Sequence, residues 1–575
     1  MKEYISNLIN LLPDYWLKNL NMIIFLTLIS AIFEILSIGL IIPFISIFID
    51  KTDYLKENFN FFSTYNKEEY VLIILILFIA LFFIKNIFLL LANKKKIDFS
   101  HNLNVYLTEK LYSKYINKRF DFHIIKNSSE LTRNLIIEIP NFSFSAIISI
   151  INLITQSILF FTILIFLIVY NPIVTFIVGI IMIILGSIII IVQQKKLKFF
   201  TLVRQEQQKM MLKLINESLG NIKEIILSKM QNFFSKKFFF HSSENAKVGK
   251  LKDFYFIIPK PSLEILVLFM LFLSVFFLVK FNYSLEEVFI VLGVFSFASV
   301  KLIPAITAIL QSIQNLRNNQ PVISLLNKEL FNNDYDNYEI KNQKDLNLSK
   351  KKLEFNVIKF NDMNFKYHNG NYIFKDINLE IKRGEKIGIV GKTGSGKTTL
   401  VNLLIGLLTP SKGKIYIDDK NIDENISNWQ QNIGYVSQET FLADETLLFN
   451  IVLQSLDEPA DKERCKYLIK LMDLEKLIET KNEGLEFVVG EKGIKLSGGQ
   501  VQRIGIARAL YKKPEILILD EATNALDADT QNKIIKNIYD EMKEKTIISI
   551  SHDIHALEYC DKTFSINNNQ FINLK

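Results

Sequence analysis

The chain has 575 residues, of which 49% are hydrophobic and 22% are charged, and its formal net charge is +8. This basic excess does not suggest nucleic-acid binding, because no basic stripe interleaved with aromatic residues occurs in the polar C-terminal half. The N-terminal half is dominated by Ile, Leu and Phe, and a soluble core of this composition would need far more polar surface than that half provides.

Apolar stretches in the first half are long enough to cross a membrane. A hydrocarbon core of ~30 Å takes ~20 helical residues. Six stretches meet this length, at about 21–49, 70–92, 143–170, 172–193, 255–279 and 286–310. The sequence therefore predicts an integral membrane protein with six spans.

The segments between the second and third spans, and between the fourth and fifth, are far longer than turns. We expect their residues to continue the spanning helices beyond the membrane. Basic residues gather in both segments: Lys94, Lys95, Lys96, Lys110, Lys114, Lys118 and Arg119 in the first, and Lys195, Lys196, Lys198, Arg204, Lys209 and Lys213 in the second. Basic residues mark the cytoplasmic side, so both termini are predicted to be cytoplasmic.

Charged residues inside the predicted spans are costly there and point to function. They are Glu34, Lys85, Lys260, Glu264 and Lys301. The helical rise of ~1.5 Å per residue places the three lysines at a similar depth near the inner leaflet. One interpretation is a ring of lysines that binds an anionic headgroup, with Glu34 beside it. The other is that Lys260 pairs with Glu264 at i,i+4 and that the remaining lysines reach to the interface.

A change in composition marks a domain boundary. Only six of the 21 glycines precede position 370, and residues 327–352 form a polar stretch rich in Asn, Lys and Asp. We therefore predict a transmembrane domain at 1–326, a linker at 327–352 and a second domain at 353–575.

The second domain contains a G-x-x-x-x-G-K-T phosphate loop. Its residues are Gly391, Lys392, Thr393, Gly394, Ser395, Gly396, Lys397 and Thr398, followed by Thr399. A predicted strand, 387–390, precedes the loop, and a helical pattern, 400–405, follows it. This context suits a loop whose backbone N–H groups surround phosphate oxygens. Lys397 would neutralise the β- and γ-phosphates of a nucleotide, and the Thr398 hydroxyl would bind Mg²⁺.

A pair of carboxylates lies at the end of a second predicted strand. Residues 516–519 are apolar and lead directly into Asp520 and Glu521. Adjacent carboxylates can divide two roles. We expect Asp520 to hold the metal and Glu521 to act as the general base toward the attacking water.

Between these two motifs, Leu496, Ser497, Gly498, Gly499 and Gln500 spell L-S-G-G-Q. The segment 353–575 therefore resembles an ATP-binding cassette (ABC) ATPase, of which this pentapeptide is the signature. The resemblance implies ATP and Mg²⁺ as cofactors. It also implies two cassettes that face each other head to tail, with ATP held between the phosphate loop of one and Ser497 and Gly499 of the other.

Other residues match positions of that family. Tyr367 resembles the aromatic residue that stacks on adenine, and Gln438 resembles the glutamine that senses Mg²⁺ and the attacking water. His552 follows the predicted strand 547–550 and resembles the histidine that contacts the γ-phosphate. The segment 524–527 resembles the loop that couples the two sites, with Asn524 where Ser is more usual. Glu521 together with His552 favours a hydrolysing site.

Six spans followed by one cassette resemble an ABC exporter half-transporter. We therefore expect the working unit to be a dimer, and the complete set of site residues favours a homodimer.

The segment 34–44, with Lys85, Lys260 and Lys301, resembles bacterial lipid-linked oligosaccharide flippases. This resemblance implies the bacterial inner membrane and an amphipathic, anionic, lipid-linked substrate. Export of a peptide, another lipid or a drug-like molecule is the alternative. An ATP-gated channel or regulator without transport is a further alternative.

Overall fold

A computed structural model describes residues 16–48, 67–280, 283–331, 354–367, 370–392, 394–424, 426–453, 459–479, 483–490, 493–552, 557–567 and 570–574. The chain divides near residue 340 into two compact units, a helical one and an α/β one.

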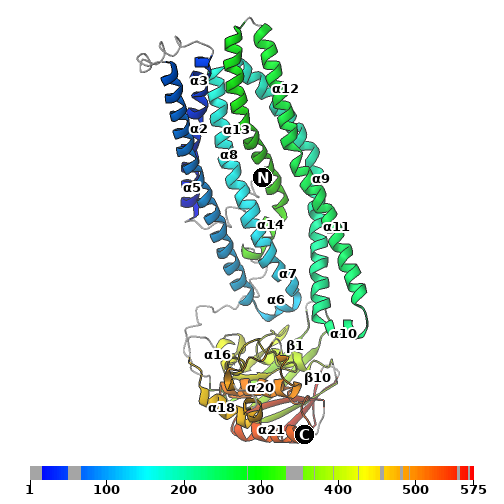
Figure 1. The fold of residues 1–575 in the computed structure, drawn as a ribbon. Helices are drawn as coiled ribbons and strands as arrows, with labels where there is room; N and C mark the ends of the chain where they lie inside the picture. Colours follow the sequence, from blue (N-terminus) through cyan, green and yellow to red (C-terminus); the bar gives the residue numbers. More distant parts are fainter. Residues whose placement is uncertain are drawn as a thin grey trace. The chain divides into compact units, whose positions relative to one another are not determined.

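The N-terminal unit is built from helices (Figure 1). Its α-helices are α2 (Trp16–Gly39), α3 (Ile41–Phe48), α5 (Lys67–Ile116), α6 (Phe120–Ile125), α7 (Ser128–Arg133), α8 (Ile148–Tyr170), α9 (Pro172–Gly220), α10 (Ile222–Leu227), α11 (Gln231–Ile257), α12 (Pro259–Lys280), α13 (Leu285–Asn318) and α14 (Gln320–Phe331). Two π-helical stretches, η2 (Asn134–Glu138) and η3 (Asn141–Ile147), lie between α7 and α8.

The longest helices extend well beyond the thickness of a bilayer. Helix α5 has 50 residues and α9 has 49, and at the helical rise each measures roughly 75 Å, against ~30 Å for a hydrocarbon core. The expected helical continuation of the spans is therefore confirmed. Helix α9 ends at Gly220, and the short helix α10 follows from Ile222.

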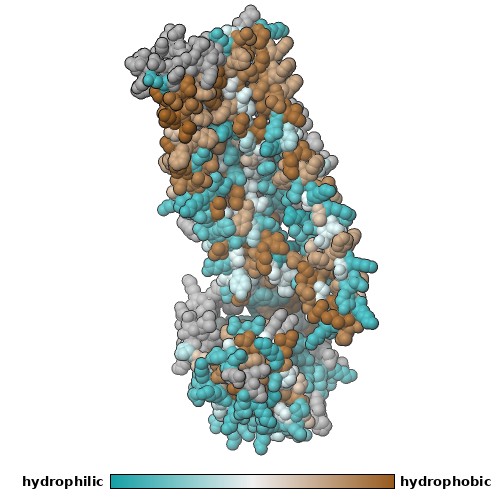
Figure 2. Space-filling view, in the orientation of Figure 1, coloured by the Kyte–Doolittle hydropathy of each residue, from teal (hydrophilic) through white to brown (hydrophobic). Residues whose placement is uncertain are grey.

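Five helical segments of the described residues are long and apolar enough to cross a membrane: Lys18–Ser46, Val71–Ile116, Ser128–Tyr170, Gln231–Lys280 and Leu285–Asn318. They coincide with five of the six predicted spans. The remaining one, at about 172–193, falls on α9, where the side chains of 177–198 are outside the described residues. Six spans therefore remain a prediction. On the face drawn in Figure 2, apolar residues gather on the helical unit around α3 and the neighbouring part of α13.

The C-terminal unit contains two sheets. Its strands are β1 (Val357–Phe365), β2 (Phe374–Lys382), β3 (Lys386–Val390), β4 (Lys412–Ile417), β5 (Lys420–Asn421), β6 (Ile433–Val436), β7 (Ile516–Asp520), β8 (Thr546–Ser551), β9 (Lys562–Asn567) and β10 (Gln570–Asn573). Its helices are α15 (Lys397–Leu404), η6 (Ile422–Glu424), α16 (Ile426–Gln431), α17 (Leu447–Val452), α18 (Lys462–Leu471), α19 (Glu475–Glu479), η7 (Gly484–Glu486), α20 (Gly498–Tyr511) and α21 (Ala528–Glu541).

The larger sheet has the strand order β10-β9-β3-β8-β7-β6. Strands β9, β3, β8, β7 and β6 pair in parallel, while the smaller sheet, β2-β1-β4-β5, is antiparallel. Every residue of β7 and β8 is buried, as expected of parallel strands covered on both faces. The predicted strands at 387–390, 516–519 and 547–550 are thus confirmed as neighbours in one sheet.

Candidate functional site

The predicted nucleotide-site residues converge at one edge of the larger sheet. The phosphate loop follows β3, Asp520 ends β7, Glu521 follows it, and His552 comes directly after β8. Gln438 follows β6, the outermost strand on that side. Because the carboxyl ends of parallel strands meet at the same edge, a sheet of this kind gathers residues that are far apart in sequence.

Glycines shape the phosphate loop. Gly394 and Gly396 have φ values of +81° and +101°, a conformation that favours residues without a Cβ atom. A Cβ on Gly396 would also lie 2.7 Å from Ile373 and 2.9 Å from the ring of Phe374. The loop therefore needs glycine at this position, where helix α15 begins. Thr393 lies outside the described residues.

Lys397 is held at the centre of the site. Its Nζ donates to the carbonyl oxygen of Gly391 at 2.7 Å and lies 4.0 Å from Oε1 of Glu521. It also donates to the carbonyl of Lys392 at 3.3 Å and to Nδ1 of His552 at 3.4 Å. Burial lowers the pKa of Lys397, an effect that the carboxylates of Glu521 and Asp520 oppose.

Glu521 is surrounded by donors. Gln438 donates from Nε2 to Oε2 of Glu521 at 2.9 Å, and Asn524 donates to the same oxygen at 3.2 Å. His552 pairs with Oε1 through Nε2. Glu521 itself adopts a φ of +52°, which is uncommon for a residue with a side chain. Its backbone N–H donates to the carbonyl oxygen of Ile550 at 3.1 Å. This fixed carboxylate is positioned to accept a proton.

Asp520 is 2% exposed, and burial together with the adjacent Glu521 raises its pKa. The hydroxyl of Tyr435 donates to its Oδ2 at 3.4 Å. Thr398 is a further hydrogen-bond partner of Asp520. The oxygen donors of Asp520, Thr398 and Gln438 are the hard ligands that Mg²⁺ prefers. Sequence reasoning did not single out Tyr435, which lies on β6, three residues before Gln438.

The phosphate loop also has a buried donor available for a nucleotide. The Oγ of Ser395 has no hydrogen-bond partner within the described part of the chain. Buried hydroxyls without partners are costly, so this donor fits a loop that binds phosphate. Tyr367, the predicted adenine contact, is 36% exposed and lies 3.3 Å, through its hydroxyl, from the Oγ1 of Thr399.

The signature residues form a separate feature. Ser497 caps α20 in a capping box: its hydroxyl accepts from the N–H of Gln500 at 3.3 Å, and the Gln500 side chain accepts from the N–H of Ser497 at 2.8 Å. Ser497 and Gly498 are exposed, whereas Gly499 is partly buried. Among the described residues, no hydrogen bond or ion pair joins the signature to Lys397, Glu521 or His552.

The charged residues of the predicted spans do not form one ring. Lys85 pairs with Oε2 of Glu34, and Lys301 lies 3.5 Å from Oε1 of the same carboxylate. The ring of Phe82 contacts both ammonium groups, at 4.6 Å from Lys85 and 5.0 Å from Lys301. Glu34 is 2% and Lys85 5% exposed. We refer to Glu34, Lys85 and Lys301 as the charged cluster.

Lys260 lies apart from the charged cluster. Lys260 and Glu264 are both exposed on α12, and within the described residues no ion pair joins them to each other or to the cluster.

Neither interpretation of the sequence accounted for Glu34 as the partner of two lysines, and Phe82 was not singled out. The spacing of Phe82 and Lys85, three residues apart on one helix, is the signal that was available.

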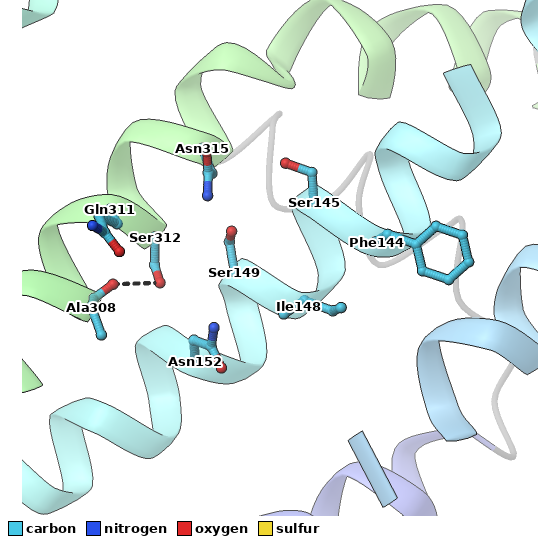
Figure 3. Close-up of a pocket in the computed structure, with 9 residues that line it drawn as sticks. All are labelled: Phe144, Ser145, Ile148, Ser149, Asn152, Ala308, Gln311, Ser312 and Asn315. Atoms are coloured by element: carbon cyan, nitrogen blue, oxygen red, sulfur yellow. Dashed lines mark hydrogen bonds between the residues drawn. The ribbon is translucent and has the colours of Figure 1, made fainter. Parts of the chain in front are cut away.

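A polar cavity of about 170 Å³ lies between α8 and α13 (Figure 3). Hydroxyl and amide side chains line much of it: Ser145, Ser149, Asn152, Gln311, Ser312 and Asn315. Ser149 and Asn315 point toward each other across the space, and Lys96 donates to Oδ1 of Asn152 at 3.0 Å. Such a lining can hold water or a neutral hydrogen-bonding group. Sequence reasoning missed it, although the polar residues recur at helical spacing on both helices.

Comparisons with known proteins support both halves of the sequence interpretation. The ABC transporter family model matches residues 374–524, and the ABC transporter transmembrane region matches residues 20–300. The chain carries both parts of an ABC transporter. Its C-terminal unit is the ATP-binding, ATP-hydrolysing domain of that family, fused behind a membrane region.

Individual relatives match the cassette. The alpha-hemolysin translocation ATP-binding protein HlyB of Escherichia coli O157:H7 is 40% identical over 214 residues, which cover 37% of this chain and 30% of HlyB. An uncharacterized ABC transporter ATP-binding protein of Bacillus subtilis, YwjA, is 38% identical over 213 residues, or 37% of each chain. The matched segment thus spans about a third of the length of these relatives.

The fold of the whole chain also has a solved counterpart. The structure of a bacterial Atm1-family ABC exporter with ATP bound matches with a TM-score of 0.75 over 95% of this chain and 94% of that one, at 18% sequence identity. This likeness shows that the ABC transporter shares the fold of an exporter, with a helical transmembrane domain followed by an α/β nucleotide-binding domain.

Proposed function

We propose that this chain is one subunit of a homodimeric, ATP-driven exporter or flippase that moves an amphipathic, anionic, lipid-linked substrate across a membrane. The distribution of basic residues supports cytoplasmic termini, a cytoplasmic cassette and, for a bacterial cell, the inner membrane. The observation that carries the substrate assignment is the charged cluster inside the helical unit.

Hydrolysis follows from the residues around Glu521. Gln438 and Asn524 fix Oε2 of Glu521 through hydrogen bonds of 2.9 and 3.2 Å, so the carboxylate is oriented to accept the proton of an attacking water. Lys397 and the loop N–H groups would bind the phosphates. Asp520, Thr398 and Gln438 would hold Mg²⁺, which polarises the phosphate oxygens when it is bound. His552, in contact with Lys397 and Glu521, would bind on the side of the γ-phosphate.

Two copies are needed in this proposal because the signature does not reach the chain's own phosphate loop. Ser497 and Gly498 are exposed at the start of α20, where backbone N–H groups and the helix dipole favour an anion. A second copy would place its signature against the phosphate loop of the first. This arrangement would make ATP part of the interface between two cassettes.

The charged cluster supports an anionic substrate. Two ammonium groups face one carboxylate, which leaves an excess positive charge among residues that are largely buried. Such a charge is costly in a membrane domain unless an anion balances it. The side chain of Lys301 is 25% exposed, so it is the member of the cluster that is open to a ligand. A phosphate or pyrophosphate headgroup would supply the missing charge.

Export of a protein or peptide is the second candidate. It is favoured by the likeness of the cassette to HlyB, which is named for alpha-hemolysin translocation. That likeness covers 37% of this chain and falls on the part that binds ATP, whereas the charged cluster lies in the membrane region. We therefore give the anionic lipid precedence.

The test is stimulation of ATP hydrolysis in nanodiscs of zwitterionic lipid. Hexadecyl phosphate, hexadecanol and hexadecyltrimethylammonium share a chain but differ in headgroup charge. We expect stimulation by the phosphate alone, and its loss in a Lys85→Gln, Lys301→Gln variant. Lys260→Gln is the matched control, since Lys260 is a lysine of a membrane helix outside the cluster. Equal stimulation by all three compounds, or equal loss in the control, would refute the anionic-substrate assignment.

A further inference from the structure

An apolar cavity of about 490 Å³ lies among α3, α5 and α13, all in the helical unit. Its volume falls within the range of ligand pockets, ~300–1,000 Å³. Its walls include Ile41 and Phe44 from α3, Leu75 and Phe78 from α5, and Phe297 and Val300 from α13. Apart from Ser296, every side chain that lines it is a hydrocarbon or an aromatic ring.

The packing of α3 against α13 depends on Gly293. A Cβ atom at this position would lie 2.0 Å from Cδ1 of Ile45, so any larger residue would force the Ile45 side chain to move. The rings of Phe78 and Phe297 contact each other in the cavity wall, with their centroids 6.1 Å apart. Residues from three helices therefore line the cavity, which is partly open to the outside, since Leu75 and Val300 of its wall are exposed.

The charged cluster lies about one helical turn beyond the wall residues of this cavity on α5 and α13. Lys301 directly follows Val300 of the wall and is one helical turn, about 6 Å, beyond Phe297. On α5 the rings of Phe78 and Phe82 stack with centroids 6.0 Å apart, and Phe82 contacts both lysines. Helix α2 packs antiparallel to α5. It carries Glu34, which precedes the wall residues Leu40 and Ile41 along the chain. An excess positive charge thus lies about one helical turn from the wall of an apolar space.

We propose that this cavity is the binding subsite for the hydrocarbon chain of an anionic lipid whose headgroup pairs with Lys85 and Lys301. The inference rests on the proposed function for the headgroup and adds a defined place for the chain. An uncharged occupant would fill the apolar space but would leave the excess charge of the cluster unbalanced.

Bulk membrane lipid is the competing occupant of the cavity. The anionic lipid and bulk lipid differ in the interactions that would hold their chains there. A chain that moves from lipid into an apolar cavity gains no hydrophobic free energy, because both environments are hydrocarbon. Selective occupation must then come from packing contacts and from the headgroup charge. A chain held by the charged cluster should consequently depend on the lysines, whereas a bulk lipid should not.

The experiment is photolabelling of the full chain in zwitterionic nanodiscs by hexadecyl phosphate that carries a diazirine at the end of its chain. Mass spectrometry of the peptides locates the label. We expect it on 74–78 of α5 and 293–300 of α13. Excess unlabelled hexadecyl phosphate should reduce this labelling several-fold, and excess hexadecanol should leave it unchanged. Competition by both compounds to the same extent would indicate bulk lipid and overturn the proposal.

Variants separate the chain subsite from the headgroup site. Leu75→Trp fills the cavity, and Ile76→Trp is its matched control, because Ile76 is an exposed aliphatic residue next to Leu75 that does not line the cavity. We expect the first to reduce labelling several-fold and the second to leave it unchanged. Stimulation of ATP hydrolysis by butyl phosphate, which has almost no chain, should survive Leu75→Trp and reports that the protein is folded.

The two proposals fail in different ways. If labelling persists in Leu75→Trp while Lys85→Gln, Lys301→Gln removes stimulation by butyl phosphate, the chain subsite is wrong and the headgroup site stands. If Leu75→Trp abolishes labelling but the lysine variant retains it, the cavity binds chains without regard to charge, and the coupling proposed here is refuted.

Discussion

The nucleotide site and the charged cluster are built from the same kinds of residue in opposite proportions. In the cassette one lysine, Lys397, faces the two carboxylates of Asp520 and Glu521, which leaves an excess negative charge beside phosphate-binding N–H groups. In the membrane region two lysines face Glu34, which leaves an excess positive charge. The first arrangement suits a metal ion together with a phosphate, and the second suits an anion alone. This difference in charge balance matches the different ligands that we propose for the two sites.

The largest expected effect comes from the carboxylate that the cassette uses as a base. Glu521→Gln should retain ATP binding while turnover falls by ~10²–10⁴, because the amide cannot accept a proton. Steady-state ATP hydrolysis and binding of a fluorescent ATP analogue measure the two properties. Glu439→Gln, an exposed glutamate near Gln438, should behave like the wild type. Near-normal turnover of Glu521→Gln would remove the general-base assignment.

A second test concerns the need for two cassettes. Lys397→Ala should lose nucleotide binding, because it removes the charge that faces the phosphates, and Ser497→Arg should block the signature. Each variant alone should be inactive. A coexpressed, affinity-purified heterodimer should regain partial hydrolysis, since one composite site carries both lesions and the other carries neither. Inactive heterodimers would count against a shared site.

A third test changes the balance of charge in the cluster in the opposite direction from the lysine variants. Glu34→Gln removes the carboxylate that Lys85 and Lys301 share, so the excess positive charge grows. We expect hexadecyl phosphate to stimulate hydrolysis at a several-fold lower concentration than in the wild type. An unchanged or higher half-stimulating concentration, in protein that still melts cooperatively, would mean that the lysines do not bind the headgroup.

The smallest expected effects concern helix caps outside both sites. Asp461 caps α18 by accepting from the N–H of Arg464 at 2.9 Å, and Asn171 caps α9 by accepting from the N–H of Val174 at 3.2 Å. Alanine at either position should cost about 1 kcal/mol of stability. Denaturant unfolding should show each loss, while ATP turnover per folded molecule stays unchanged. A change in turnover would indicate that the cap also shapes a functional site.

The nucleotide site could be predicted because its information is local. The phosphate loop, the Asp520-Glu521 pair and the signature are contiguous motifs, and the strands beside them bring their ends to one edge of a sheet. Two contacts were less visible. The contact of Tyr435 with Asp520 depends on how β6 and β7 lie side by side, and the bond of Asn524 to Glu521 depends on the turn after β7.

The contacts in the membrane region were harder to predict, because the position of a residue along a helix does not tell which side of the helix its side chain faces. Helical rise placed Lys85, Lys260 and Lys301 at a similar depth, but helices that are apolar on all sides offer no periodic signal for their faces. The structure places Lys260 on an exposed face and turns Lys85 and Lys301 toward Glu34. The apolar cavity was equally hidden, because its walls come from three helices whose side chains are ordinary membrane residues.

Movement of lipid between the leaflets of proteoliposomes measures most directly whether the charged cluster is needed to transport an anionic lipid. The variant Glu34→Gln, Lys85→Gln, Lys301→Gln removes every charge of the cluster while keeping similar lengths and polar ends, and it leaves the residues of the cassette intact. We predict that ATP-dependent movement of fluorescent hexadecyl phosphate between the leaflets is lost in this variant, that its basal ATP hydrolysis is retained, and that Lys260→Gln transports normally. Undiminished movement of the lipid by the neutral variant would contradict the account.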